Sequence, residues 1–213
     1  MSALIAPIIG YLVGAVPFAL LVGFAYGVDL RKVGSGNPGA GNLSRTCGVP
    51  AGALGAILDG AKSLFVVLAL RQAGFDEGAL WLTGVAAVIG HNWSIFLRGR
   101  AGRGLASSAG VLVALDPALL WWTTAGAVSG WKIGGGLGGT LGWGLLPFVG
   151  LALDRPAYEI WGLIGLALLM FIRRAQGNPG RQPGFKAAIF RAIFDQEPGQ
   201  SPLVESPVEA GAM

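Results

Sequence analysis

Charged, redox-active and metal-binding side chains are scarce in this sequence. Asp, Glu, Lys and Arg make up 12% of the 213 residues, against about 25% in ordinary soluble domains. The one cysteine, Cys47, cannot form a disulfide within the chain. No cysteine and histidine spacing suits a metal, and the one histidine, His91, has no serine and acid set around it for nucleophilic catalysis. We therefore expect no metal and no cofactor, and no pattern indicates nucleic-acid binding.

Long apolar runs occupy most of the chain instead. Hydrophobic residues make up 53% of the sequence, and residues 3–26 carry no charge. That run is long enough to cross about 30 Å of hydrocarbon at about 1.5 Å per helical residue. It is too long for a signal peptide, and no Lys or Arg precedes it. We expect one all-α integral membrane domain over residues 1–175, with apolar segments at 3–26, 50–70, 79–97, 105–115, 117–131, 133–153 and 157–172.

The number of crossings depends on the fourth segment, 105–115. As a helix of about 11 residues it spans roughly 16 Å, too short to cross alone, so it is either a short or broken crossing or part of the fifth. Cytoplasmic loops carry an excess of Lys and Arg, and only the count of about seven crossings gathers most basic residues on one side. We predict seven, with the N-terminus outside and the C-terminus cytoplasmic, and with these residues inside: Arg31, Lys32, Arg45, Arg98, Arg100, Arg103, Lys132, Arg173, Arg174, Arg181, Lys186 and Arg191.

The stretch 33–45, the first loop, combines glycines with neutral and charged donors. Glycine reaches positive φ, so successive backbone N–H groups can converge on an anion. Arg45 can grip a phosphate with two parallel hydrogen bonds. The alternative is a plain connector between two helices. The candidate phosphate-binding residues are Gly34, Ser35, Gly36, Asn37, Gly39, Asn42 and Arg45.

Two charges lie inside the second apolar segment. Asp59 and Lys62 are three residues apart, so they share one helical face. Each costs roughly 2.5–3.5 kcal/mol at the centre of a membrane helix. They form either a neutralising pair that holds helices in register or a substrate site in which Lys62 meets an anion.

A second basic stretch runs from Gly90 to Ser108. Arg98, Arg100 and Arg103 precede a new apolar helix, and a helix N-terminus offers free N–H groups to a phosphate. The alternative is a loop that touches anionic lipid headgroups. His91, taken alone, is typical of a packed residue at a helix end.

These motifs resemble those of the bacterial membrane acyl-phosphate:glycerol-3-phosphate acyltransferases. The first family motif, close to GSGNxGATNxxR, is found from Gly34 to Arg45, with Gly41 in place of threonine. An LD-x-x-K feature ends at Lys62. The second motif, GHxxxxFxxFKGGKGVAT, begins at Gly90, and arginine replaces both of its lysines while serine replaces its threonine, at Arg100, Arg103 and Ser107.

The third family motif, which resembles RHREN, is only partly present at 173–178. Arg173 fits, Arg174 and Ala175 depart, and Asn178 matches only after a shift. The resemblance implies that this cluster helps to hold the acceptor, glycerol 3-phosphate. It also implies a fold of seven helices with three cytoplasmic motifs in a bacterial inner membrane.

The resemblance implies transfer of a fatty acyl group from acyl phosphate to the sn-1 hydroxyl of glycerol 3-phosphate, a step of phospholipid synthesis. Ser35, Asn37 and Arg45 are the candidate catalytic residues. The partners are the two substrates and membrane lipids, and the substrate phosphates would be bound at Gly34, Gly36, Gly39, Asn42, Lys62, His91, Arg100, Arg103, Ser107, Arg173 and Asn178. A transporter or flippase of a phosphorylated anion, or an inactive family member, stays open.

The C-terminal part follows the last apolar segment. We expect an interfacial cytoplasmic segment at 176–194, with an amphipathic helix at 185–194 for which partner binding is an alternative. Residues 195–213 hold four acidic residues and no basic one, and we expect them to be disordered.

Overall fold

A computed structural model describes residues 4–99, 101–133, 135–178, 181–194 and 198. All regular structure within these residues is helical. The elements are α1 (Ile5–Gly14), α2 (Phe18–Ala25), α3 (Ala40–Cys47), α4 (Val49–Gln72), α5 (Glu77–Asn92), the short 3-10 helix η1 (Ile95–Leu97), α6 (Leu105–Leu115), α7 (Ala118–Ile133), α8 (Gly135–Gly144), α9 (Leu146–Ala152), α10 (Ala157–Gln176) and α11 (Phe185–Phe194).

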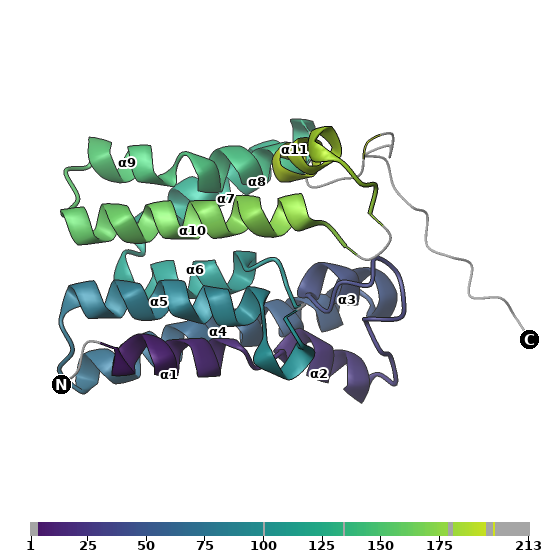
Figure 1. Ribbon diagram of the computed structural model, residues 1–213, viewed down its shortest axis with the longest axis horizontal. Helices are drawn as coiled ribbons and strands as arrows, with labels where there is room; N and C mark the ends of the chain where they lie inside the picture. Colours follow the sequence, from purple (N-terminus) through teal and green to yellow (C-terminus); the bar gives the residue numbers. More distant parts are fainter. Residues whose placement is uncertain (1–3, 100, 134, 179–180, 195–197, 199–213) are drawn as a thin grey trace, which may run out of the picture.

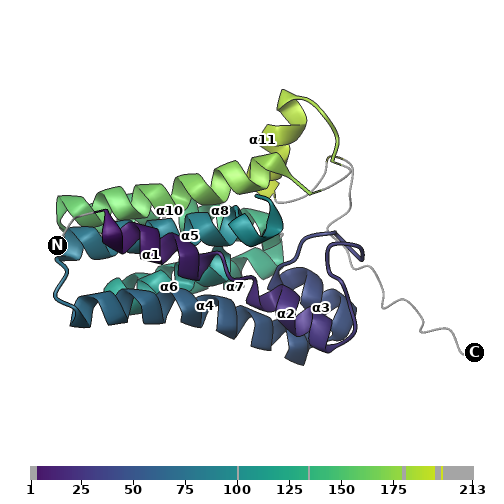
Figure 2. The same cartoon turned by 60° about the horizontal axis from the view of Figure 1, so that its bottom comes forward.

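The helices lie side by side along one axis in two packed groups (Figure 1). In that view α1, α4, α5 and α6 form the lower group, and α7 to α10 form the upper one. The helices α3 and α11 lie near one end of the bundle, with the first loop and the connection between α5 and α6; in Figure 2, α11 crosses the end of α10. The predicted motifs therefore meet at one end.

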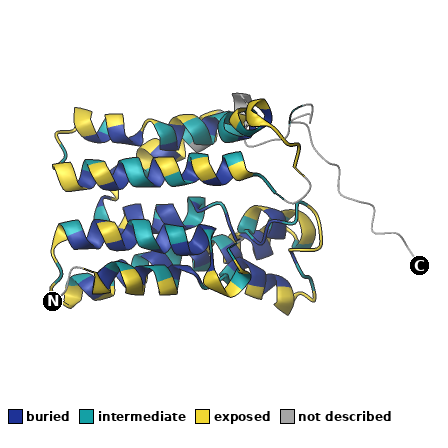
Figure 3. Cartoon of the chain, in the orientation of Figure 1, coloured by how far each residue is buried: buried dark blue, intermediate teal, exposed yellow. Residues whose placement is uncertain are grey.

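Among the residues that the structure describes, three stretches are long and apolar enough to span a membrane: Ile5–Ala25, Val49–Gln72 and Glu77–Leu97. Large apolar side chains of these stretches are exposed, such as Ile57 at 66% and Phe65 at 65%. Figure 3 shows exposed positions along the outside of the bundle. Exposed apolar surface of this extent is expected where lipid, and not water, covers the protein. The third stretch consists of α5 and η1.

The predicted short fourth segment is present as α6, with the predicted bounds of 105–115. It ends before Asp116 and Pro117, and α7 follows as a separate helix, so the two segments are not fused. Interruptions also occur where we expected continuous helices. The first stretch is divided between α1 and α2, and the sixth between α8 and α9.

The interruption of the first stretch has a local cause at Pro17. Proline has no N–H to donate and its ring clashes with the preceding turn, so α1 ends at Gly14 and α2 begins at Phe18. The carbonyl groups of Ala15 and Val16 then face other helices. Ser94 donates to the carbonyl of Ala15 at 2.6 Å, and Lys62 donates to that of Val16 at 2.6 Å.

Small residues allow the helix backbones to approach closely. Gly10 and Gly14 of α1 face Thr83 and Ala87 of α5, and a methyl group at Gly10 would lie 2.5 Å from the Thr83 carbonyl oxygen. This four-residue spacing of small residues is the one that lets membrane helices pack closely. On α8, Gly139 leaves room for the Arg174 guanidinium.

Candidate active site

A buried ionic cluster joins α4 and α5 to the link between α1 and α2. The Nζ atom of Lys62 on α4 lies 2.8 Å from Oδ1 of Asp59, 3.0 Å from Nδ1 of His91 on α5, and 2.6 Å from the Val16 carbonyl oxygen. An ammonium has three hydrogens to donate, and these partners use all of them. The side chains of Lys62 and Asp59 are each 2% exposed. The predicted shared face is confirmed, and in this structure Lys62 holds His91.

The orientation of His91 follows from this contact. Because an ammonium only donates, Nδ1 accepts from Lys62, and we assign the ring proton to Nε2. Nε2 faces Gly102, where any Cβ would collide with it, so the imidazole fits only against a glycine. The Gly102 N–H in turn donates to the His91 carbonyl at 3.2 Å. Gly102 therefore covers the ring.

Asn42 organises the first loop from the helix that follows it. Its Nδ2 donates to the carbonyls of Leu30 and Val33, each at 3.0 Å, and its Oδ1 accepts from the Ser35 N–H at 3.0 Å. Gly34 has φ +56°, and a Cβ there would collide with Asn42 Oδ1, so glycine is required. Asn42 thus shapes the loop in this structure, and its predicted phosphate contact stays a prediction.

Ser35 and Asn37 present polar atoms that have no hydrogen-bond partner. Ser35 Oγ and Asn37 Oδ1 are both buried and unpaired. An unsatisfied buried group costs about 1–3 kcal/mol, so such atoms indicate a place where a ligand completes the bonding. Asn37 Oδ1 lies 3.5 Å from the position that a Cβ of Gly39 would occupy, and that position is 3.8 Å from Gly102 Cα. The two motifs meet there, above His91.

Ser107, at the start of α6, bonds to another helix. Its Oγ lies 2.5 Å from Oγ of Ser63, the residue after Lys62 on α4, and both residues are fully buried. This contact joins α4 to α6 beside the ionic cluster. The sequence did not indicate Ser63.

The two arginines of the partly matched third motif contact different parts of the protein. Arg173 donates to the Ala101 carbonyl at 2.9 Å, so it reaches the turn that covers His91. Arg174 donates to the Gly136 carbonyl at 3.1 Å and to Thr140 Oγ1 at 2.9 Å, so its guanidinium lies against α8. Both are buried.

The other predicted cations and polar groups lie around this end. Arg45 is exposed on α3, and Arg103 and Asn178 are half-buried. Arg100 lies outside the described residues, as does the predicted acidic tail apart from residue 198. In the first connection the Arg31 guanidinium, hydrogen-bonded at 2.8 Å, lowers the pKa of Asp29 to about 2, which keeps that carboxylate charged.

Sequence reasoning missed two polar residues of the second motif. Asn92 is fully buried, and neither polar atom of its side-chain amide has a hydrogen-bond partner. Ser94 bonds to the carbonyl of Ala15. Polar residues that end an otherwise apolar membrane helix are the signal that could have indicated both.

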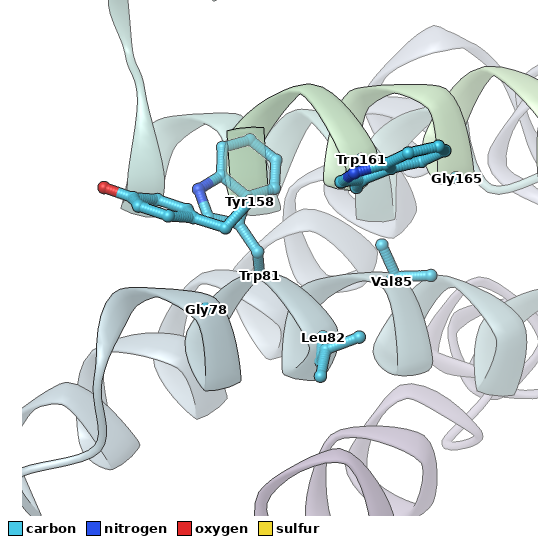
Figure 4. Close-up of a pocket in the computed structure, with 8 residues that line it drawn as sticks. Gly78, Trp81, Leu82, Val85, Tyr158, Trp161 and Gly165 are labelled. Atoms are coloured by element: carbon cyan, nitrogen blue, oxygen red, sulfur yellow. The ribbon is translucent and has the colours of Figure 1, made fainter. Parts of the chain in front are cut away.

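An apolar groove lies on the bundle surface between α5 and α10 (Figure 4). Its volume is about 290 Å³, and Figure 4 shows Trp81, Leu82 and Val85 on one side with Tyr158 and Trp161 on the other. Gly162 packs against the Trp81 indole. The groove begins six residues from His91 along α5, or about 9 Å at the helical rise.

The fold and the site define an all-helical membrane protein whose two glycine-rich loops meet over a buried Lys–His–Asp cluster. The family model for glycerol-3-phosphate acyltransferase matches residues 4–183. The glycerol-3-phosphate acyltransferase of Thermus thermophilus is 39% identical over 188 residues, which cover 84% of this chain and 94% of that one. Glycerol-3-phosphate acyltransferase 1 of Deinococcus radiodurans is 37% identical over 208 residues, covering 88% and 99%. The chain belongs to the glycerol-3-phosphate acyltransferase family.

Solved structures give the same assignment. The crystal structure of PlsY (YgiH), an integral membrane glycerol 3-phosphate acyltransferase, in its glycerol 3-phosphate form has a TM-score of 0.75 and 30% identity. The match covers 83% of this chain and 90% of that chain. The lysophosphatidic acid form has a TM-score of 0.74 and 28% identity. The predicted family resemblance is therefore confirmed.

Proposed function

We propose that the chain transfers a fatty acyl group from an acyl phosphate to the sn-1 hydroxyl of glycerol 3-phosphate. The products are lysophosphatidic acid and phosphate. One observation carries this proposal: the first loop meets the turn over His91 where Gly39 approaches Gly102. The unpaired Asn37 Oδ1 lies at this meeting point. The family relatives named for glycerol 3-phosphate acylation support the acceptor.

The chemistry requires positioning more than a covalent intermediate. The sn-1 hydroxyl oxygen attacks the acyl carbonyl carbon, an ester bond forms, and the bond from that carbon to the phosphate oxygen breaks. The hydroxyl proton passes to the departing phosphate, whose second pKa of about 6 lets it act as a base near neutral pH. Alignment of the two substrates and stabilisation of the developing negative charge then supply most of the acceleration.

The first loop holds the phosphate of the donor in this proposal. Backbone N–H groups around Gly34, Gly36 and Gly39 converge on the anion, and the Ser35 hydroxyl and the Asn37 Nδ2 donate to it, while Asn37 Oδ1 accepts from a hydroxyl of the acceptor. Arg45, exposed beside the loop, approaches as the substrate binds. Asn42 keeps the loop in shape through its three hydrogen bonds.

In this proposal the second and third motifs bind the phosphate of glycerol 3-phosphate and fix the Ala101–Gly102 turn. His91 presents its Nε2 proton beneath Gly102, with Lys62 and Asp59 fixing the ring. Arg100 and Arg103 supply positive charge, and Arg173 fixes the Ala101 carbonyl. We assign Asn178 to the acceptor and Ser107 to the support of α6.

The reaction takes place at the inner leaflet in this proposal. The basic loops lie at the same end of the bundle, which supports seven crossings, an external N-terminus and a cytoplasmic site in a bacterial inner membrane. The acyl chain enters from the lipid. The apolar groove between α5 and α10 offers a surface for such a chain on the way to His91.

One observation favours a second candidate, an inactive family member. Arg174 stands where the third family motif has histidine, and its guanidinium is bonded to α8 at Gly136 and Thr140. If this position must contact the acceptor, the chain would bind donor and transfer nothing.

The test uses the purified full-length chain in lipid vesicles with a long-chain acyl phosphate and radiolabelled glycerol 3-phosphate. We expect labelled lysophosphatidic acid with acyl phosphate and none with the acyl thioester donors. Donor binding without product would support the inactive candidate. Uptake of label into sealed vesicles without acylation would overturn both in favour of transport.

Two variants test whether the first loop takes part in the reaction. Ser35→Ala and Asn37→Ala should each lower turnover by roughly 10²–10³-fold, the usual cost of one lost donor to developing charge. The control is Ser129→Ala, an exposed serine on α7. Full activity in both loop variants would remove the loop from the reaction.

A further inference from the structure

We propose that Arg191, on the C-terminal helix α11, is a positioning residue for the active site. It holds the end of α10 and acts through Gly177 and Arg173 on the Ala101–Gly102 turn that covers His91. This inference rests on the proposed function for its kinetic part only, because the contacts that carry it also predict a change in local backbone protection.

Arg191 is buried although it belongs to a short helix at the end of the bundle. It is 5% exposed, whereas Lys186 on the same helix is exposed. Its Nε and Nη2 donate to the Ala175 carbonyl at 3.1 and 3.0 Å, and its Nη1 donates to the Gln182 carbonyl at 2.9 Å. A forked guanidinium that caps the last turn of a helix fixes both the helix end and the returning chain.

Gly177 lies between two guanidinium groups. A Cβ at Gly177 would lie 2.8 Å from Arg191 Nε, and its φ of +65° also requires glycine. Its carbonyl accepts from Arg173 Nη1 at 3.2 Å. Any displacement of Arg191 therefore changes the space available to Gly177, and with it the bond that orients Arg173.

Arg173 carries the effect to the site. Its Nη2 donates to the Ala101 carbonyl at 2.9 Å, and the next residue, Gly102, packs on His91 and lies beside Gly39. A second bond, from Trp93 Nε1 to Gln176 Oε1 at 3.0 Å, ties the same end of α10 to the same connection. The end of α10 is thus joined to the second motif at two points.

The contact of Arg191 lies at the position where this chain differs from the third family motif. Ala175 stands where the family motif has a second arginine, and Arg191 brings a guanidinium to the carbonyl of that same residue. Arg174 is held by α8 instead, and α11 is held by α8 as well, since Thr140 Oγ1 donates to the Ile193 carbonyl at 2.5 Å. In this chain α11 therefore fixes the end of α10.

The kinetic test compares Arg191→Met with Arg191→Lys in the full-length chain, and the matched control is Lys186→Met, which removes the same charge from the exposed face of α11. For Arg191→Met we expect the KM for glycerol 3-phosphate to rise and kcat/KM to fall by about 10- to 100-fold, the range of a small misplacement of catalytic groups. Arg191→Lys should recover part of the loss in kcat/KM. An unchanged KM, with activity lost only in proportion to folded protein, would overturn the proposal.

A second measurement does not depend on catalysis. Hydrogen exchange of the segment that contains Ala101 and Gly102 should be faster in Arg191→Met than in the wild type or in Lys186→Met, while α4 is unaffected. Unchanged exchange in that segment would refute the coupling. If the wild type transfers no acyl group from acyl phosphate, the proposed function fails, and the exchange experiment still decides the role of Arg191.

Discussion

The ammonium of Lys62 and the carbonyl oxygen of Val16 lie 2.6 Å apart, although they belong to different membrane segments. Val16 lies in the gap between α1 and α2 that Pro17 creates, so its carbonyl can accept from a side chain. The interruption of the first helix and the buried charge of the second therefore explain each other. A lysine needs acceptors in an apolar interior, and a broken helix needs donors.

We expect Lys62→Met to lower the free energy of unfolding by about 3–5 kcal/mol and to abolish turnover, because it leaves Asp59 buried without its cation and His91 without its donor. The double variant Asp59→Asn/Lys62→Met should recover part of the stability and none of the activity. Thermal unfolding in detergent and the acyl phosphate assay measure the two effects.

The control for this prediction is Lys32→Met, whose side chain is 80% exposed in the first connection. It should leave the unfolding temperature unchanged. Full activity in the Lys62 variant would mean that the cluster only holds α1, α4 and α5 in register.

Much of the fold followed from apolar periods and breaker residues. The bounds of α6, the helix at 185–194 and the face shared by Asp59 and Lys62 were all predicted correctly. Each is a local property, because a short run of sequence sets the length of an apolar helix and the spacing of its side chains. The breaks at Pro17 and between α8 and α9 were not predicted, since a membrane helix tolerates proline where neighbours supply bonds.

The sequence predicted which residues belong to the site better than it predicted the contacts between them. Sequence spacing placed Asn42 and Ser107 in motifs, but it could not show that Asn42 bonds back to Leu30 and Val33 or that Ser107 pairs with Ser63. These contacts join residues far apart in the chain. Arg191 was assigned to an interfacial helix, because an amphipathic pattern of ten residues gives no sign of which face a bundle end will cover.

Gly102→Ala should abolish turnover, because the new methyl group would occupy the position of the His91 Nε2 atom and displace the imidazole or the turn. The matched control is Gly41→Ala. Gly41 has no heavy atom near its Cβ position, and alanine should stabilise α3 by up to about 1 kcal/mol. Assays of both variants beside the wild type check this. Equal activity in Gly102→Ala would show that the ring position is unimportant.

Asn42→Asp should destabilise the first loop by about 2–3 kcal/mol, since a carboxylate cannot donate to the carbonyls of Leu30 and Val33. It keeps the acceptor for the Ser35 N–H, so the loss reports on the two donated bonds. Thr46→Val removes the hydroxyl that donates to the Asn42 carbonyl at 2.8 Å, lies 3.4 Å from the Leu43 carbonyl and accepts from Cys47 Sγ, and it should cost about 1 kcal/mol. Limited proteolysis of the loop and thermal unfolding distinguish the two; a larger effect in the threonine variant would contradict the assignment.

Ser63→Ala and Ser107→Ala should behave alike. Each leaves one buried hydroxyl unpaired, so each should lower stability by about 1–3 kcal/mol and leave both KM values unchanged. The double variant should be less destabilised than the sum of the two. If Ser107→Ala alone raises the KM for either substrate, then Ser107 contacts a substrate phosphate, and its assignment to the support of α6 is wrong.

The single cysteine provides a direct test of the proposed topology. Cys47 ends α3 at the basic end of the bundle and is partly exposed, so a cysteine reagent that cannot cross membranes should label it in inverted vesicles and not in intact cells. Ala73→Cys in a Cys47→Ser background, at the opposite end of α4, should show the reverse pattern. The reversed pair acts as its own control for access. Labelling of Cys47 from outside would place the first loop and His91 on the wrong side for a cytoplasmic acceptor.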